Sequence, residues 1–194
     1  MNQRRTMDFR AQKTRESIRK TFREMLKEMD FEEISVKELT DRAQINRRTF
    51  YLHYPSLDSL LNELIDEIAD GYIEKTQSLD GYADQPEIAR TFLSYFAQQD
   101  ELHEKIICSS SFKYISDRIN RKISEANQGH VDNLGKVDAY TKNLIIAYMN
   151  SSCLGMYRRW VADKKKVPVE RFLGIAVQLV CSGVLGLPDF LESK

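Results

Sequence analysis

Apolar residues recur at spacings of three and four along most of this chain, and that periodicity limits the possible folds more than any other feature. It is clearest between Phe9 and Met29, where one helical face collects Ile18, Phe22, Met25, Leu26 and Met29. A second apolar stripe follows Ser56, which is placed as an N-cap, and runs through residues 57–72. No run of alternating apolar and polar residues predicts a strand. The sequence therefore predicts an all-α protein.

Further helices are predicted downstream. Asp84-Gln85-Pro86 opens one, with the proline in the first turn, where its missing N–H group costs nothing. The others are expected at Leu102–Cys108, from Ser109 to about Ala126, at Val137–Ala162 and at Pro168–Leu187, with a polar loop at Asn127–Lys136.

Composition excludes several classes of protein. The chain has 194 residues, 42% of them hydrophobic, with 8 Gly and 4 Pro, which fits neither a disordered nor a fibrous chain. The longest apolar run, near residues 175–187, is interrupted and too short to span a membrane, and the basic first twenty residues lack the apolar segment of a secretory signal. The three widely spaced cysteines, Cys108, Cys153 and Cys181, indicate free thiols. We therefore expect a cytoplasmic protein without a membrane partner.

The charges balance overall but not along the chain. Lys and Arg total 29, as do Asp and Glu, yet residues 1–54 carry a net charge of +4 and residues 55–194 a net charge of −4. Such a chain can direct its basic end toward a polyanion and keep the acidic remainder away from it. The alternative is chance clustering on solvated helices, and the charge pattern leaves both open.

Two short, separately capped helices between Ser35 and Tyr54 carry most of the information about function. Ser35 and Glu38 fit a capping box, in which the Ser35 hydroxyl accepts the Glu38 N–H and the Glu38 carboxylate accepts the Ser35 N–H. Asn46 is a suitable N-cap for the second helix, and Pro55 prevents that helix from continuing. Two helices joined by such a short link indicate a helix-turn-helix motif.

The second of these helices has an outward face suited to the major groove of DNA. With Phe50 in the core and about 100° between residues, Arg48 and Leu52 point away from the core, while Thr49 and Tyr51 lie on the flanks. Arginine can donate two hydrogen bonds to guanine, an apolar group can contact the thymine methyl, and hydroxyl groups can bind phosphate. The start of the preceding helix is also placed to bind phosphate.

The stretch SVKELTDRAQINRRTFYLHY at Ser35–Tyr54, with the PSLDSLL that follows, resembles the DNA-binding domain of TetR-type (TetR/AcrR) transcriptional regulators. The resemblance covers about residues 11–72, and its T-F-Y-x-H-Y run is specific. It implies a three-helix DNA-binding domain at 11–72, with the helix-turn-helix motif at 35–54, and a C-terminal helical domain at 73–194 for dimerisation and effector binding. The residues expected to contact DNA are Ser35, Lys37, Asn46, Arg47, Arg48, Thr49, Tyr51, Leu52 and His53.

The sequence departs from the family pattern at two positions. Gln44 stands in the turn where the family usually has Gly, and a positive φ angle there would cost about 1 kcal/mol. Leu57 stands where the family often has a phosphate-binding Lys. An arm containing Arg4, Arg5 and Arg10 could supply a contact instead by entering an adjacent minor groove, and a disordered basic tail is the alternative.

The last two helices are the expected homodimer interface. The small residues Ser151, Gly155, Gly174 and Gly183 would let helix axes approach closely. Two helices from each subunit would then form a four-helix interface about a two-fold axis, which predicts a palindromic double-stranded DNA operator. The alternative is that these faces only close the core of one subunit.

A small-molecule effector site is expected between the middle helices. The candidate lining residues are Phe92, Tyr95, Phe96, Cys108, Phe112, Tyr148, Met149, Met156 and Trp160. Aromatic and Met residues at helical spacing also form ordinary cores, so both interpretations stay open. A bound effector would act by tilting the 57–72 helix and changing the distance between the two recognition helices.

No arrangement of residues indicates catalysis, a cofactor or a metal site. His53, His103 and His130 lack ligand partners at suitable spacing, and the sequence has no nucleophile elbow, phosphate-binding Gly-rich loop or dinucleotide fingerprint. We therefore expect a homodimeric transcriptional regulator, a repressor released by a small molecule, and not an enzyme. The alternatives are an activator or co-regulator that needs a protein partner, and an all-α ligand-binding or scaffold protein without DNA recognition.

Overall fold

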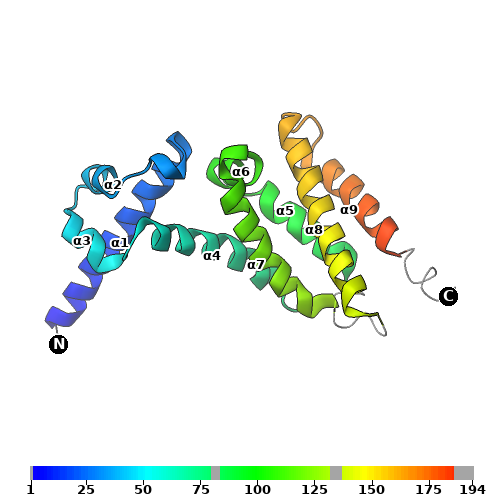
Figure 1. Ribbon diagram of the computed structural model, residues 1–194, viewed down its shortest axis with the longest axis horizontal. Coiled ribbons are helices and arrows are strands. Elements are labelled where there is room, and N and C mark those ends of the chain that lie inside the picture. The colour runs from blue at the N-terminus through cyan, green and yellow to red at the C-terminus, as the bar shows by residue number, and fades with distance from the viewer. Residues whose placement is uncertain (1, 80–83, 132–136, 186–194) are drawn as a thin grey trace. The chain divides into compact units, whose positions relative to one another are not determined.

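The structure is a computed structural model that describes residues 2–79, 84–131 and 137–185, with side chains at 9–79, 84–126 and 137–183 (Figure 1). Every regular element in these ranges is a helix, which confirms the all-α class. None of the described helices is long and apolar enough to cross a membrane. The side chains of Arg4 and Arg5 and the last two residues of the predicted 168–187 helix lie outside the described residues.

The chain divides into two compact units, Met1–Asp66 and Glu67–Lys194. Helix α4 (Leu57–Thr76) contributes to both of them. The domain boundary that we predict after residue 72 also falls within this helix, and it stays a prediction.

The first unit packs three helices and the start of α4 around one small core. These are α1 (Asn2–Glu28), α2 (Val36–Arg42) and α3 (Arg47–His53), with a short 3₁₀ helix, η1 (Phe31–Glu33), between α1 and α2. The predicted apolar faces meet here, and eight side chains are at most 1% exposed: Ile18, Phe22, Met25, Leu26, Leu39, Phe50, Leu60 and Leu61. Burial of each stabilises the fold by about 1.5–3 kcal/mol.

Helix α1 begins earlier than the apolar pattern predicts. The pattern places its start at Phe9, whereas the helix begins at Asn2. Residues 2–8 contain neither Pro nor Gly and include the good helix formers Gln, Arg and Met, so nothing interrupts the helix there. The sequence of this segment has no apolar stripe, and periodicity therefore could not reveal it.

Among its described residues, the second unit contains the rest of α4 and five further α-helices. They are α5 (Gln85–Ala97), α6 (Glu101–Cys108), α7 (Lys113–Val131), α8 (Ala139–Ala162) and α9 (Val169–Leu185), with a 3₁₀ helix, η2 (Ser110–Phe112), before α7. Helix α5 packs against α8 and α9, α7 against α8, and α6 against α7 (Figure 1). The expected loop begins too early, because Asn127–Val131 still belong to α7. A single Gly inside a helix costs about 1 kcal/mol, which the rest of a long helix tolerates.

Aromatic rings form a continuous contact chain through the second unit. Tyr72 of α4 meets Phe92 of α5 at 5.5 Å between ring centroids, and the chain continues through Phe96 and Tyr157 to Trp160. Trp160 then stacks on Phe172 of α9 at 4.7 Å with the ring planes 7° apart. Such ring pairs stabilise by about 0.5–1.5 kcal/mol beyond the area they bury.

The second unit also depends on Gly71 in the middle of α4. The Tyr95 hydroxyl donates a 2.9 Å hydrogen bond to the Ile68 carbonyl. It lies 2.6 Å from the position that a Cβ atom on Gly71 would occupy. Any larger residue at position 71 would therefore displace the Tyr95 ring.

Candidate nucleic-acid interface

Local capping fixes both short helices of the predicted helix-turn-helix motif. The Ser35 hydroxyl accepts the Glu38 N–H at 3.1 Å, which starts α2. Asn46 Oδ1 accepts both the Thr49 N–H at 2.8 Å and the Thr49 hydroxyl at 3.0 Å, which starts α3. A cap of this kind contributes about 1 kcal/mol to helix stability.

Only half of the predicted capping box at Ser35 is present. The Glu38 carboxylate does not turn back to the Ser35 N–H but binds Arg42 at 2.8 Å, one helical turn further on. Arg42 also pairs with Glu28 of α1, so it joins two helices. A charged partner makes a stronger hydrogen bond than a backbone N–H group, which explains the choice.

The turn between α2 and α3 has a left-handed residue. Gln44 has a φ angle of 55°, in the region that favours glycine. Its N–H donates to the Asp41 carbonyl at 3.2 Å, and the Ile45 N–H donates to the Thr40 carbonyl at 3.0 Å. This pair of bonds is a Schellman motif, which ends α2 and sets the direction of the chain into α3.

The inner face of α3 is fixed to α1 and α4. Phe50 is fully buried and Tyr54 is 3% exposed. The Tyr54 hydroxyl accepts a 3.1 Å hydrogen bond from Arg15 of α1, whose guanidinium lies over the Tyr54 ring and binds Glu63 of α4 at 2.6 Å. The hydrogen bonds to Glu63 and then to Tyr54 raise the pKa of Arg15, and burial raises the pKa of Tyr54. Arg15 thus holds α3 at a fixed angle.

The outer face of α3 is open to solvent, as the predicted rotation of the helix requires. Leu52 is 77% exposed and Tyr51 is 55% exposed, although both are large apolar or aromatic side chains. The exposed residues among those predicted to contact DNA are Ser35, Lys37, Asn46, Arg47, Arg48, Tyr51 and Leu52, and Thr49 and His53 are half-buried. Their contact with DNA stays a prediction.

The cations of the first unit fall into two groups. Arg15 and Arg19 of α1 share Glu63, and Arg42 of α2 is paired as described above. Arg47 and Arg48 of α3 and Lys37 of α2, by contrast, make no ion pair within the part of the chain that the structure describes. Unpaired guanidinium groups beside exposed apolar side chains can bind guanine edges, thymine methyl groups and phosphates.

The sequence did not reveal the link through Arg15. Arg15, Arg19 and Arg23 recur every fourth residue on α1, but Glu63, the partner of Arg15 and Arg19, comes from another helix. Glu63 lies 48 residues further along the chain, and no local pattern connects the two. Only the packing of α4 against α1 brings them together.

The nine predicted effector residues lie partly in the core and partly nearer the surface. Phe92, Tyr95, Phe96 and Phe112 are buried in the core, where the first three contact one another or the rings described above. Tyr148 is instead 41% exposed and donates a hydrogen bond to the Leu179 carbonyl of α9 at 3.3 Å. Cys108 and Met149 are half-buried. The assignment of these residues to an effector stays a prediction.

An apolar groove lies on the surface between α8 and α9. Its volume is about 380 Å³, and it includes two of the predicted effector residues, Met156 and Trp160. The remaining lining residues are Arg159, Asp163, Lys166, Val167, Phe172, Ile175, Ala176 and Leu179. Ile175 and Leu179 are more than half exposed, so the groove continues into an open apolar face.

The three cysteines are free thiols, as predicted. Burial raises the pKa of Cys153 to about 12, and burial followed by the charge of Glu104 raises the pKa of Cys108 to about 11. Burial also raises the pKa of Cys181. Because the thiolate is the reactive form, these surroundings favour unreactive thiols.

Comparison with known proteins agrees with the motif. The profile of the family described as "Bacterial regulatory proteins, tetR family" matches residues 18–64. The uncharacterized HTH-type transcriptional regulator YxbF of Bacillus subtilis (strain 168) is 37% identical over 60 residues. That match covers 30% of this chain but only 16% of YxbF, so this chain spans about one sixth of the relative's length.

Solved structures share the fold over most of this chain at low identity. A TetR transcriptional regulator from Streptococcus agalactiae 2603V superposes with a TM-score of 0.72 at 23% identity, over 90% of this chain and 97% of that one. NalD, the secondary repressor of the MexAB-OprM multidrug efflux pump in Pseudomonas aeruginosa, gives 0.67 at 14% identity over 89% and 97%. The regulator FadR from Bacillus subtilis, in complex with stearoyl-CoA, gives 0.62 at 14% identity over 86% and 97%. The comparisons therefore show a segment similar to the tetR family of bacterial regulatory proteins at residues 18–64, and a fold shared with the solved structures over most of the chain.

Proposed function

We propose that this protein is a sequence-specific DNA-binding transcriptional regulator in the bacterial cytoplasm, a homodimeric repressor released by a small molecule. The observation that carries the proposal is the outer face of α3, where two unpaired arginines lie beside Leu52, at 77% exposure, and Tyr51. Cations without an ion-pair partner beside exposed apolar side chains supply both kinds of contact that base edges and phosphates offer. The family match at residues 18–64 supports DNA as the binding partner of this face.

The proposed base reading follows from the chemistry of α3. Arg48 donates two hydrogen bonds to the O6 and N7 atoms of one guanine, and Leu52, one turn later, contacts a thymine methyl. Lys37 and Tyr51 bind phosphates on the two sides of the major groove and set the position of the helix. Arg15 and Tyr54 keep α3 at the angle that this geometry needs.

The proposed dimer interface is the open apolar face of α8 and α9. Five large apolar or aromatic side chains on these two helices are 41–72% exposed: Tyr140, Leu144, Tyr148, Ile175 and Leu179. A Cβ atom added to Gly155 or Gly174 would meet nothing within 4 Å, so both glycines leave room for another helix. A second copy that covers this face would form a four-helix interface and fill the α8–α9 groove.

An effector is proposed to act on the second unit. FadR of Bacillus subtilis was solved with stearoyl-CoA, and the present chain shares its fold. A ligand that binds one conformation of the second unit better than another would shift the population of states. Helix α4 belongs to both compact units. We propose that such a shift changes the position of α4 and thereby that of α3.

The experiment is a gel shift on DNA flanking the gene, searched first for an inverted repeat, at increasing salt concentrations. We expect binding that weakens steeply with salt, because each phosphate contact releases counterions. Candidate metabolites are then added one at a time, and the metabolite that is the effector should weaken DNA binding. Failure to bind any duplex at low salt would contradict DNA recognition and favour an all-α ligand-binding or scaffold protein.

A further inference from the structure

The groove between α8 and α9 is apolar along its length. Trp160 of α8 and Phe172 of α9 line it and are 8% and 7% exposed, whereas Ile175 and Leu179, which also line it, are 51% and 60% exposed. From Phe172 to Leu179 it extends about 10 Å along α9, at 1.5 Å per residue. Its volume of about 380 Å³ falls within the roughly 300–1,000 Å³ of small-molecule sites. The groove therefore has the size and the length for a linear apolar chain.

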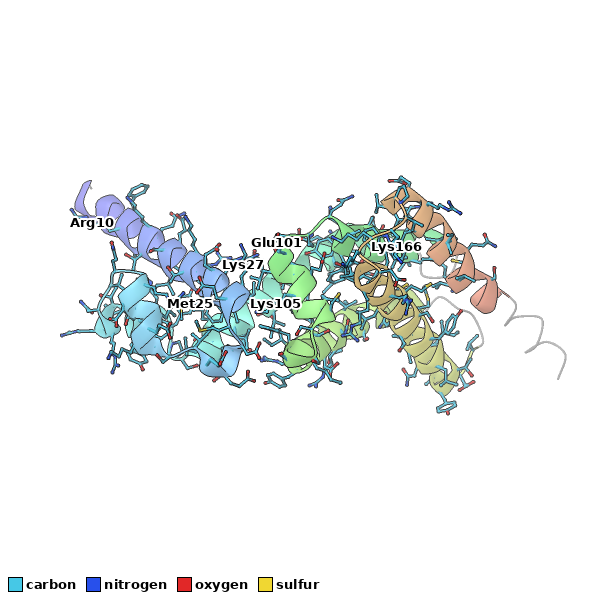
Figure 2. The ribbon with its side chains drawn as sticks, turned by 90° about the horizontal axis from the view of Figure 1, so that it is seen from above. Arg10, Met25, Lys27, Glu101, Lys105 and Lys166 are labelled. Carbon is cyan, nitrogen blue, oxygen red and sulfur yellow. The ribbon has the colours of Figure 1, made fainter. Side chains whose placement is uncertain are left out.

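One end of this groove, where α8 turns into α9, carries an excess positive charge. The lining contains the charged side chains of Arg159, Asp163 and Lys166. Arg159 and Asp163 neutralise each other through a contact of 2.8 Å. Lys166 is exposed and makes no ion pair with any residue that the structure describes. Figure 2 shows Lys166 beside the ends of α8 and α9 that their connecting turn joins. An apolar groove with one net positive charge at its end matches a chain that ends in one negative charge.

The turn that carries this lysine is held in place by contacts on both sides. Lys164 and Lys165 have φ angles of 56° and 52°, in the left-handed region that residues with a Cβ atom rarely adopt. The Lys165 ammonium binds Glu104 of α6 at 2.6 Å. The Trp160 indole N–H donates to the Val167 carbonyl at 3.0 Å. Because the backbone is fixed before any ligand arrives, little ordering of the turn is needed on binding.

We infer that the α8–α9 groove binds a medium-chain monocarboxylate, with its alkyl chain between Phe172 and Leu179 and its carboxylate beside Lys166. The alkyl chain removes exposed apolar surface from water, and the carboxylate accepts charge-assisted hydrogen bonds from the lysine ammonium. Helix α9 begins at Val169, two residues after Val167 of the groove lining. The positive end of the α9 dipole therefore favours an anion at the same end of the groove.

The consequence for assembly rests on the proposed function. The proposed second copy would cover the same groove, so the carboxylate and the second copy exclude each other there. A medium-chain carboxylate should therefore convert the dimer into a monomer, and a higher protein concentration should weaken its binding. This competition acts on assembly and does not require a movement of α4.

The fluorescence of Trp160 reports on the groove, because Trp160 is the only tryptophan of the chain. The whole chain is titrated with octanoate and, separately, with octanol, and the tryptophan emission is recorded at two protein concentrations. Sedimentation velocity measures the mass of the protein at each octanoate concentration. Lys166→Ala is the test variant. Lys164→Ala is the matched control, because Lys164 is an exposed lysine of the same turn that does not line the groove.

We expect octanoate to change the emission of the wild type until the change saturates, at higher octanoate concentrations when more protein is present. Lys166→Ala should weaken octanoate binding by about two- to fivefold, as for an exposed ion pair, and leave octanol binding unchanged. Lys164→Ala should bind both compounds like the wild type. No change in emission, an equal loss in Lys164→Ala, or a dimer that persists at saturating octanoate would overturn this inference. A wild type that is monomeric without octanoate would contradict the proposed dimer instead, and the Lys166→Ala comparison would still test the groove.

Discussion

At the scale of single residues, the helix-turn-helix motif contains one conformation that its sequence does not favour. Gln44 adopts a φ angle of 55°, which costs a residue with a Cβ atom about 1–2 kcal/mol. The Schellman hydrogen bonds donated by Gln44 and Ile45, together with the burial of Leu39, offset that cost locally. The hydrogen bonds and packing around the turn therefore stabilise the left-handed conformation of Gln44.

Gln44→Gly is expected to raise the free energy of unfolding by about 0.5–1 kcal/mol, because glycine adopts this φ angle without strain. Urea denaturation of the whole protein measures the effect. Gln44→Ala is the control, since it retains the Cβ atom and should change stability by less than about 0.5 kcal/mol. A destabilising Gln44→Gly would show that the exposed Gln44 side chain contributes more than the strain costs.

Thiol reactivity gives a second prediction at this scale. Burial raises the pKa of Cys108 to about 11 and that of Cys153 to about 12. In the folded protein at pH 8 we expect iodoacetamide to label both slowly, and quickly once urea unfolds the chain. Because both pKa values are raised on folding, their contribution to stability is complete below about pH 9 and is lost as pH rises toward 11–12. Rapid labelling of native Cys108 by mass spectrometry would indicate a thiol sensor instead.

At the scale of elements, a helix boundary or contact could be predicted from the sequence where the residues that determine it lie close together along the chain. The starts of α2 and α3 could be predicted because Ser35 and Asn46 cap them from within four residues. The start of α1 could not, because no apolar stripe marks its first turns in the sequence. The aromatic residues of α5 and α8 were visible, but which of them are core depends on contacts such as Phe96 with Tyr157, 61 residues apart. Sequence alone offers no signal for such pairs.

Substitutions of Asn46, the N-cap of α3, should affect stability and DNA binding differently. Asn46→Ala removes the acceptor for the Thr49 N–H and hydroxyl groups and should cost about 1 kcal/mol of stability. Asn46→Asp keeps the acceptor and should retain stability in urea denaturation, yet its negative charge next to Arg47 should weaken DNA binding. If Asn46→Asp were as unstable as Asn46→Ala, the side chain would not act as the cap.

At the scale of the whole molecule, exposed apolar side chains concentrate at two places. Tyr51 and Leu52 are on α3, and five others are on α8 and α9. An operator contacted by two copies of α3 needs a fixed dimer, because the two half-sites are read together. The two apolar sites are therefore parts of one function in this proposal.

Leu179→Glu should convert the dimer to a monomer, because it places a charge on the apolar face that a second copy would cover. Sedimentation velocity should give twice the 22.6 kDa chain mass for the wild type and the single mass for the variant. Leu52→Glu is the control, an equally drastic change at an exposed leucine on α3, and should stay dimeric. A dimeric Leu179→Glu would place the interface elsewhere.

The central claim is that the outer face of α3 reads base pairs, and selection of preferred sequences from random duplex DNA tests it most directly. Wild type, Arg48→Ala and Lys37→Ala are compared at one salt concentration. We expect Arg48→Ala to lose about 1–3 kcal/mol at one base position and to relax the preference there, and Lys37→Ala to weaken all sequences evenly. An Arg48→Ala variant with the affinity and base preference of the wild type would contradict the claim.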